Sequence, residues 1–311
     1  MMTSDNSKPV SAAAVAVAAA DCAADPAPAA VAGLLGAGRP SRSALAVAML
    51  RAAHQLLDGA SVFADPLALS IIGPELAAEV RDDPARFDAG LARVLRMAMA
   101  LRSRLAEDEL AAAVARGVRQ YVVLGAGLDT SAYRNDVPDL RVFELDHPAT
   151  QAWKRGLLRA AGIAVPATLS LVPVDFERDT LGAALAGAGC RLDQPVFFSW
   201  LGVTLYLSDQ AIFATLAQVA ALPAGSGIVF DYGVAPELLE PMARMGMQHI
   251  ARKYAAEGEP WKSFFDPAVL ARRLHGLGFG ALADVGAAEL LARYPAAHSV
   301  GGGTRLMLAN V

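Results

Sequence analysis

From residue 120 onward, short apolar runs recur along the chain, and segments of helical length separate them. The first run, residues 121–124, is uniformly apolar, which is typical of a buried parallel strand. Further runs predict strands at residues 141–145, 169–174, 196–200, 228–232, 279–285 and 304–310. Because helices alternate with these strands, we predict an α/β fold with a seven-stranded, mostly parallel sheet and right-handed crossovers.

The other parts of the chain have a different pattern. Residues 40–117 read as a helical prelude that must pack onto the sheet, and residues 234–265 form a helical insertion after the fifth predicted strand. Residues 1–38 are rich in Ala, Pro and Gly without apolar periodicity, so we expect a disordered tail before one domain at 39–311. Helices are predicted at residues 44–57, 85–115, 148–161, 180–188, 208–221 and 266–276.

Composition excludes several classes of function. The 311 residues carry a net charge of −4 without a dense Lys/Arg stripe, which argues against nucleic-acid binding. Cys22 and Cys190 are too few for a disulfide framework or a thiolate metal site, and the five histidines have no ligand-like spacing. No apolar run approaches the roughly 20 residues of a membrane span. The segment 11–20 lacks the Leu, Phe and basic flank of a signal peptide, so we expect a cytoplasmic protein without membrane or nucleic-acid partners.

A glycine turn followed by an acid is the first candidate for binding chemistry. Gly125, Ala126 and Gly127 follow the first strand, where the small side chains let the backbone approach a ligand closely. Asp146 ends the second strand at the distance where an acid can accept hydrogen bonds from ribose hydroxyls. This pairing indicates nucleoside binding, although the glycines alone could also mark only a tight turn.

The residues after the glycines distinguish between two nucleoside ligands. A dinucleotide fingerprint has a third glycine at position 130, and this chain has Thr130 there. Asp129 places a negative charge where a phosphate would lie. The cationic sulfonium of S-adenosylmethionine suits such a loop better, and NAD remains the alternative cofactor.

A resemblance to a known family rests on motifs that are spread along the chain. They lie at residues 40–43, 63–68, 123–134, 143–148, 172–176 and 200–206. With these motifs, residues 40–311 resemble the leucine carboxyl methyltransferase family of class I S-adenosylmethionine-dependent methyltransferases, in particular its actinobacterial O-methyltransferases. The resemblance implies a Rossmann-like class I methyltransferase fold, with the prelude as N-terminal helices and the insertion as a lid.

The same resemblance assigns residues to the cofactor. It places Gly125, Ala126 and Gly127 under the methionine moiety, Asp146 on the ribose, Asp175 on the adenine amino group, the Phe176 N–H on the ring and Arg102 on the carboxylate. Trp200 is expected to line the pocket, although a Trp after a buried strand is often part of the core. An arginine offers a bidentate fork to a carboxylate. Arg102 could instead pair with Glu107 or Asp108 on its own helix, in which case Arg104 is the second candidate. Asp175 could equally cap the helix that follows Thr180.

The reaction implied is O-methylation of a small organic acceptor. A carboxylate acceptor needs no base, whereas a hydroxyl benefits from one. Candidate catalytic residues are Asp231, Tyr232 and Tyr206, while His147 could merely begin a helix. Leu201 stands where many relatives carry a glutamate, so a catalytically inactive S-adenosylmethionine-binding module stays possible beside an NAD-dependent oxidoreductase. Met242, Met245, Met247, Tyr254 and Trp261 make the insertion an apolar lid, or else a helix that packs on the core.

Overall fold

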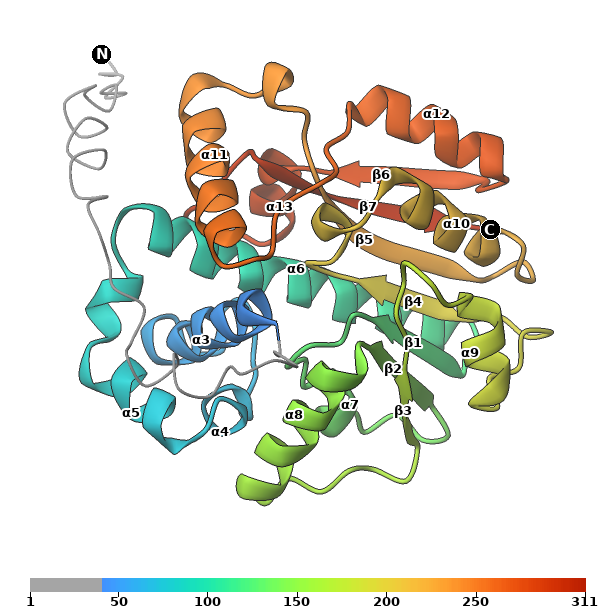
Figure 1. Ribbon diagram of the computed structural model, residues 1–311, viewed down its shortest axis with the longest axis horizontal. Coiled ribbons are helices and arrows are strands. Elements are labelled where there is room, and N and C mark those ends of the chain that lie inside the picture. Colours follow the sequence, from blue (N-terminus) through green and yellow to red (C-terminus); the bar gives the residue numbers. More distant parts are fainter. Residues whose placement is uncertain (1–40) are drawn as a thin grey trace, which may run out of the picture.

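A computed structural model describes residues 41–311, and the predicted tail at 1–38 lies outside this range. A single seven-stranded sheet runs through the centre in the order β3-β2-β1-β4-β5-β7-β6 (Figure 1). Its strands are β1 (Gln120–Leu124), β2 (Arg141–Asp146), β3 (Leu169–Pro173), β4 (Phe197–Trp200), β5 (Gly227–Gly233), β6 (Ala281–Val285) and β7 (Thr304–Asn310). Of the strands within residues 41–311, only β7 runs antiparallel to its neighbours β5 and β6. The predicted seven-stranded, mostly parallel sheet is therefore confirmed.

Helices surround the sheet, and some of them lie where the sequence predicted no helix. They are α3 (Arg42–Leu57), α4 (Ala68–Ile71), α5 (Pro74–Asp82), α6 (Gly90–Ala115), α7 (Ser131–Arg134), α8 (Pro148–Ala160), α9 (Leu181–Gly187), α10 (Asp209–Ala220), α11 (Pro241–Ala256), α12 (Pro267–Leu277) and α13 (Ala287–Arg293). Short 3-10 turns lie at Pro84–Phe87, Thr204–Tyr206 and Pro236–Leu238. The sequence pattern missed α7 and also α13, which lies in the connection between β6 and β7. It gave no bounds for α4 and α5 within the helical prelude.

Local hydrogen bonds explain where several helices begin. The Ser41 hydroxyl accepts a hydrogen bond from the Ala44 N–H at 3.1 Å, as expected for the cap of α3. The Ser208 hydroxyl caps α10 in the same way, by accepting from the Ala211 N–H at 3.3 Å. These caps satisfy N–H groups that have no partner within the helix.

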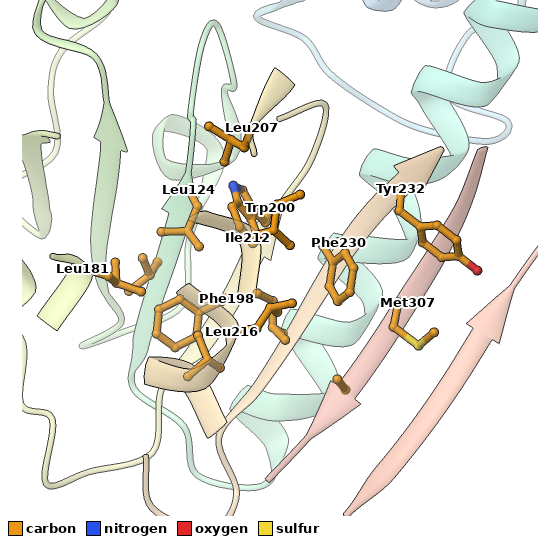
Figure 2. Packing of buried hydrophobic residues seen from close by; sticks show 14 of the residues in the cluster. Leu124, Leu181, Phe198, Trp200, Leu207, Ile212, Leu216, Phe230, Tyr232 and Met307 are labelled. Atoms are coloured by element: carbon orange, nitrogen blue, oxygen red, sulfur yellow. The ribbon is translucent and has the colours of Figure 1, made fainter. Parts of the chain in front are cut away.

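The two faces of the sheet are covered by different helices. Helices α9, α10 and α12 pack on one face, where Trp200, Phe230 and Tyr232 belong to one apolar cluster (Figure 2). Helices α6 and α13 cover the other face through a second cluster that includes Leu101 and Val229. Successive residues of a strand point to opposite faces, so neighbours on β4 and β5 enter different layers.

The prelude helices have a third apolar cluster of their own. It joins α3, α4 and α5 with residues of α8 and with Leu128 of the glycine turn. In Figure 1, α3 and α11 lie at the same side of the molecule, near the N-terminal part of α6. Within residues 41–311, no helix has the length and apolar character needed to cross a bilayer.

Candidate functional site

A large cavity lies where the parallel strands end. Its volume is about 1150 Å³, and it lies between the carboxyl ends of β1, β2, β4 and β5 and the helices α3, α6 and α11. Pockets for one small ligand commonly measure roughly 300–1,000 Å³, so this cavity has room for a nucleoside ligand beside a second molecule. Of the residues predicted from sequence, its wall contains Arg102, Gly125, Ala126, Gly127, Asp146, Asp175, Phe176, Tyr206 and Asp231.

The glycine turn after β1 is tightly enclosed. Gly125 has φ +66°, and a Cβ there would lie 2.3 Å from Cγ2 of Val203. The N–H groups of Gly125 and Ala126 donate to the Leu145 carbonyl at 2.8 and 3.1 Å. The turn thus requires glycine for its backbone conformation and for contact with the loop after β4, and it still forms part of the cavity wall.

Thr130, at the position of the missing third glycine, belongs to a buried polar network. Its hydroxyl donates to Oδ2 of Asp65 at 2.8 Å and accepts from Nη2 of Arg51 at 2.9 Å and from Nε of Arg134 at 3.1 Å. Arg51 and Asp65 also form an ion pair, and both are buried. The threonine therefore ties the glycine turn to α3 and to the segment before α4.

Asp129 gives the turn a negative charge. Its Oδ1 accepts hydrogen bonds from both the N–H and the hydroxyl of Ser131. Burial acts to raise the pKa of Asp129, but Arg51, Lys154 and the bonds from Ser131 outweigh it and hold the pKa below its usual value. An ionised carboxylate on the cavity wall disfavours a phosphate and favours a cationic ligand group.

Asp146 is held in a fixed orientation at the end of β2. Its Oδ2 accepts from the Gly127 N–H at 2.5 Å, and its Oδ1 accepts from the His147 N–H at 2.6 Å. Burial raises the pKa of Asp146, although these N–H donors oppose the rise. Glu144, the other acid of this strand, is fully buried and pairs with Nζ of Lys154 at 2.7 Å. Asp146 is thus the acid of β2 that can meet a ligand in the cavity.

The segment after β3 brings Asp175 and Phe176 to the cavity wall. Oδ1 of Asp175 accepts from the Glu177 N–H at 3.1 Å, which closes a local turn. Helix α9 begins at Leu181 after Thr180, and no side chain caps it. Asp175 therefore does not cap α9, which was the alternative interpretation of its position.

Arg102 pairs with neither Glu107 nor Asp108, the two acids of its own helix that were considered as partners. Its Nη1 lies 2.8 Å from Oδ2 of Asp231 on β5, so two residues predicted for different roles form one ion pair. Glu107 pairs instead with Arg134, and Asp108 with Nε of Arg104 at 2.8 Å. Arg104 does not line the cavity in the described part of the chain, which leaves Arg102 as the candidate for a ligand carboxylate.

Two predicted site residues lie elsewhere, and these expectations need correction. The side chains of Trp200 and Tyr232 are fully buried in the apolar cluster of Figure 2. Neither belongs to the cavity wall. The Tyr232 hydroxyl donates to Oδ1 of Asp284 at 3.0 Å. Tyr232 lies on the face of the sheet that α9, α10 and α12 cover. Strand alternation is the physical reason, since Ser199 and Asp231 face the cavity and their next neighbours must point away.

The other half of the cavity is mostly apolar. Its apolar wall is formed by α6 (Leu91, Val94, Leu95, Ala98 and Met99) and by the predicted insertion (Met242, Met245, Met247, Ile250, Tyr254 and Trp261). Polar side chains of the insertion also reach this wall (Gln248, His249, Arg252 and Lys262). The Tyr206 ring lies 6.4 Å from the Tyr254 ring, and the Tyr254 ring lies 6.1 Å from that of Trp261. Burial raises the pKa of the Tyr206 hydroxyl. The insertion thus covers the cavity as well as packing on the core.

Sequence reasoning missed the residues that hold the cavity wall together. Glu259, in the loop after α11, accepts hydrogen bonds from the N–H groups of Arg42 at 2.7 Å and Ser43 at 3.1 Å. A carboxylate is favoured at a helix N-terminus, so this contact fastens the insertion to α3. The run Gly301–Gly303 also lines the cavity, and three successive glycines were a signal of close approach that sequence reasoning did not use.

Comparison with a family model identifies the chain. Residues 44–220 match the model described as leucine carboxyl methyltransferase, which is more than half of the chain. The chain belongs to the leucine carboxyl methyltransferase family. The family resemblance seen in the motifs is thereby confirmed.

Relatives within the leucine carboxyl methyltransferase family carry matching names. The chain is 33% identical over 201 residues to a Bacillus subtilis protein named "Putative S-adenosyl-L-methionine-dependent methyltransferase YktD". It is 36% identical over 190 residues to a putative S-adenosyl-L-methionine-dependent methyltransferase from Frankia alni. A protein of the same name from Mycolicibacterium gilvum is 41% identical over 160 residues. The aligned parts span 66%, 64% and 52% of these relatives' own lengths, less than two thirds in each case. Their names agree with the cofactor expected from sequence.

A solved structure supports the fold. The crystal structure of a "putative methyltransferase" from Thermobifida fusca YX superposes with a TM-score of 0.50 at 16% identity, covering 88% of this chain and 95% of that one. This likeness, together with the strand order, confirms the class I methyltransferase fold expected for a member of the leucine carboxyl methyltransferase family.

Proposed function

We propose that this protein transfers a methyl group from S-adenosylmethionine to an oxygen of a small, apolar acceptor. One observation carries the proposal: a single cavity joins the Gly125–Gly127 turn and Asp146 to an apolar wall made by α6 and α11. When bound, S-adenosylmethionine supplies a methyl group on a positively charged sulfur, which an oxygen nucleophile takes in an in-line displacement. Both ligands must lie in one enclosed space for this reaction.

The residues of the polar half suit the cofactor. Asp146 would accept from the ribose hydroxyls, and Asp175 and the Phe176 N–H would meet the adenine. Arg102 would bind the terminal carboxylate, and the ionised Asp129 favours the positive sulfur over a phosphate. Thr130 supports the same choice, because its hydroxyl is already engaged with Arg51 and Asp65 instead of leaving room for a dinucleotide pyrophosphate.

Of the residues predicted as catalytic, none is free to take a proton from an acceptor, which favours an acceptor oxygen that is already ionised. Both carboxylate oxygens of Asp231 accept hydrogen bonds from Arg102 and Gly202, and Tyr232 lies outside the cavity. Burial raises the pKa of the Tyr206 hydroxyl above its ordinary value, so this group stays protonated at neutral pH and is not a base there. A carboxylate acceptor requires no proton transfer, so a lipophilic carboxylic acid fits this wall better than an alcohol.

Two measurements test the proposal. Calorimetric titration should show binding of S-adenosylmethionine and weaker or undetectable binding of NAD. Incubation with S-adenosylmethionine carrying a labelled methyl group and a panel of apolar carboxylic acids and alcohols should yield products methylated on oxygen. Tighter binding of NAD, or methyl found on nitrogen, carbon or sulfur, would contradict the proposal. Cofactor binding without turnover across a wide panel would favour an inactive binding module, consistent with Leu201 in place of the family glutamate.

A further inference from the structure

Asp231 connects three elements around the cavity. Its Oδ2 lies 2.8 Å from Nη1 of Arg102 on α6, and its Oδ1 accepts from the N–H of Gly202 at 2.6 Å, just after β4. The side chains of Arg102 and Asp231 are only 12% and 8% exposed. A partly buried pair with a backbone donor on the second oxygen holds its geometry better than an exposed ion pair.

Gly202 fixes the guanidinium of Arg102 from a second side. It has φ +73°, and a Cβ at this position would lie 2.9 Å from Nη2 and 3.1 Å from Nη1 of Arg102. The guanidinium therefore lies against the bare backbone of Gly202. A larger residue would strain the turn and displace Arg102.

Arg102 lines the cavity and makes one hydrogen bond within the described residues. Within residues 41–311, its hydrogen bond to Asp231 uses Nη1, and Nε and Nη2 have no protein acceptor. Arg102 lines the cavity together with Gly125 and Gly202. A guanidinium that is held at one nitrogen can still offer its other N–H groups to a planar carboxylate.

We propose that Asp231 is a positioning residue: it aims the free N–H groups of Arg102 at the carboxylate of the methionine end of S-adenosylmethionine, and it does not act as a general base. This inference rests on the proposed function, since it assumes that S-adenosylmethionine is the ligand. It assigns Asp231 to cofactor recognition, where the sequence suggested acid–base chemistry. The loop at Gly202 also holds Arg102 in place, because the guanidinium lies against the Gly202 backbone and the Gly202 N–H binds Asp231.

The experiment compares two ligands that differ only in the carboxylate. Calorimetry measures S-adenosylmethionine and its decarboxylated form on the wild type and on Asp231→Asn, Arg102→Ala and Gly202→Ala. Each variant should weaken S-adenosylmethionine by about 10- to 100-fold, the range for a charge-assisted hydrogen bond, and should change the decarboxylated ligand by no more than about twofold. The double variant of Arg102 and Asp231 should lose less than the product of the two single losses, because both act on one contact.

Gly202→Ala keeps every charge, so it tests the position of Arg102 even if Asp231→Asn folds poorly. Asp193→Asn, which changes an exposed pair with Arg191, is the matched control and should bind both ligands as the wild type does. Equal losses for the two ligands would assign Asp231 a structural role and overturn the inference.

Turnover separates the inference from the function on which it rests. With S-adenosylmethionine saturating, Asp231→Asn should retain the pH profile of the wild type. An unchanged affinity for S-adenosylmethionine with a lower kcat and an altered pH profile would make Asp231 a base and overturn the inference. A wild-type protein that does not bind S-adenosylmethionine would instead refute the proposed function.

Discussion

The hydroxyl of Thr130 donates a 2.8 Å hydrogen bond to Oδ2 of Asp65, a residue 65 positions earlier in the chain. This bond joins the turn that forms the cavity floor to the helical prelude. It explains why a polar, branched residue occupies the place where a dinucleotide-binding loop has glycine. The prelude is thereby part of the site and not a separate covering.

Replacing Thr130 should therefore cost stability. Thr130→Val keeps the shape but removes both the donor to Asp65 and the acceptor for Arg51, and we expect the free energy of unfolding to fall by about 1–3 kcal/mol. Urea denaturation measures the loss. Thr168→Val, at an exposed position, is the control and should stay within about 0.5 kcal/mol of the wild type. Equal stability of both variants would show that the network around Asp65 tolerates an unpaired group.

Cofactor affinity should depend on the ionisation of Asp146. Burial raises the pKa of this carboxyl above its ordinary value of 3.8, and the protonated form is a poorer acceptor for ribose hydroxyls. Affinity for S-adenosylmethionine should be full at neutral pH and should fall on acidification, beginning at a higher pH than an ordinary aspartate would give. Asp146→Ala should bind S-adenosylmethionine about 1.5–3 kcal/mol more weakly at neutral pH. The affinity of this variant should not show the same fall on acidification. Calorimetry across a pH series checks both statements. If the affinity of the variant fell on acidification as that of the wild type does, the fall would belong to another titrating group.

The methionines of α11 should affect the acceptor and not the cofactor. Met245 is 51% exposed and lines the cavity, so a bound acceptor would cover part of its apolar surface. Met245→Gln should therefore raise the acceptor KM by up to about tenfold. Leu238 is 53% exposed but lies off the cavity wall, and Leu238→Gln is the matched control. Steady-state kinetics with each substrate varied in turn measures the effect. A similar change in both variants would place the acceptor elsewhere.

Tyr232 should matter for stability alone. Tyr232→Phe removes the hydrogen bond to Asp284, and we expect a loss of about 0.5–1.5 kcal/mol in the free energy of unfolding with kcat within about twofold of the wild type. Thermal unfolding and initial rates measured on the same preparation decide the outcome. A fall in kcat of about 10²–10⁴, the range for lost acid–base assistance, would restore Tyr232 as a catalytic candidate.

The sheet could be predicted from sequence because each of its strands has a short apolar run of its own. The starts of α3 and α10 have a local signal of the same kind, since Ser41 and Ser208 place a hydroxyl just before a helical segment. Helix α13 was missed although α9, which is equally short, was predicted. The difference is that α9 joins two parallel strands, a connection that is usually helical, whereas α13 joins two antiparallel strands, which need no helix.

The candidate site was predictable only in part. Gly125 and Asp146 belong to consecutive strand ends, so their spacing along the chain indicated their closeness. Successive side chains of a strand point to opposite faces, so Trp200 and Tyr232 point away from the face of Ser199 and Asp231. This rule was not used when Trp200 and Tyr232 were predicted as site residues. The pairing of Arg102 with Asp231 spans 129 residues and depends on how α6 crosses the sheet, which no local pattern encodes.

The contact of Glu259 with the start of α3 has a kinetic consequence. The carboxylate satisfies two N–H groups that a helix cannot satisfy itself, so separating α3 from the loop after α11 leaves those groups without partners. Attraction between a carboxylate and a helix N-terminus weakens as salt screens it. The residence time of a molecule enclosed beneath this loop should consequently shorten as ionic strength rises, even where its contacts inside the cavity stay the same.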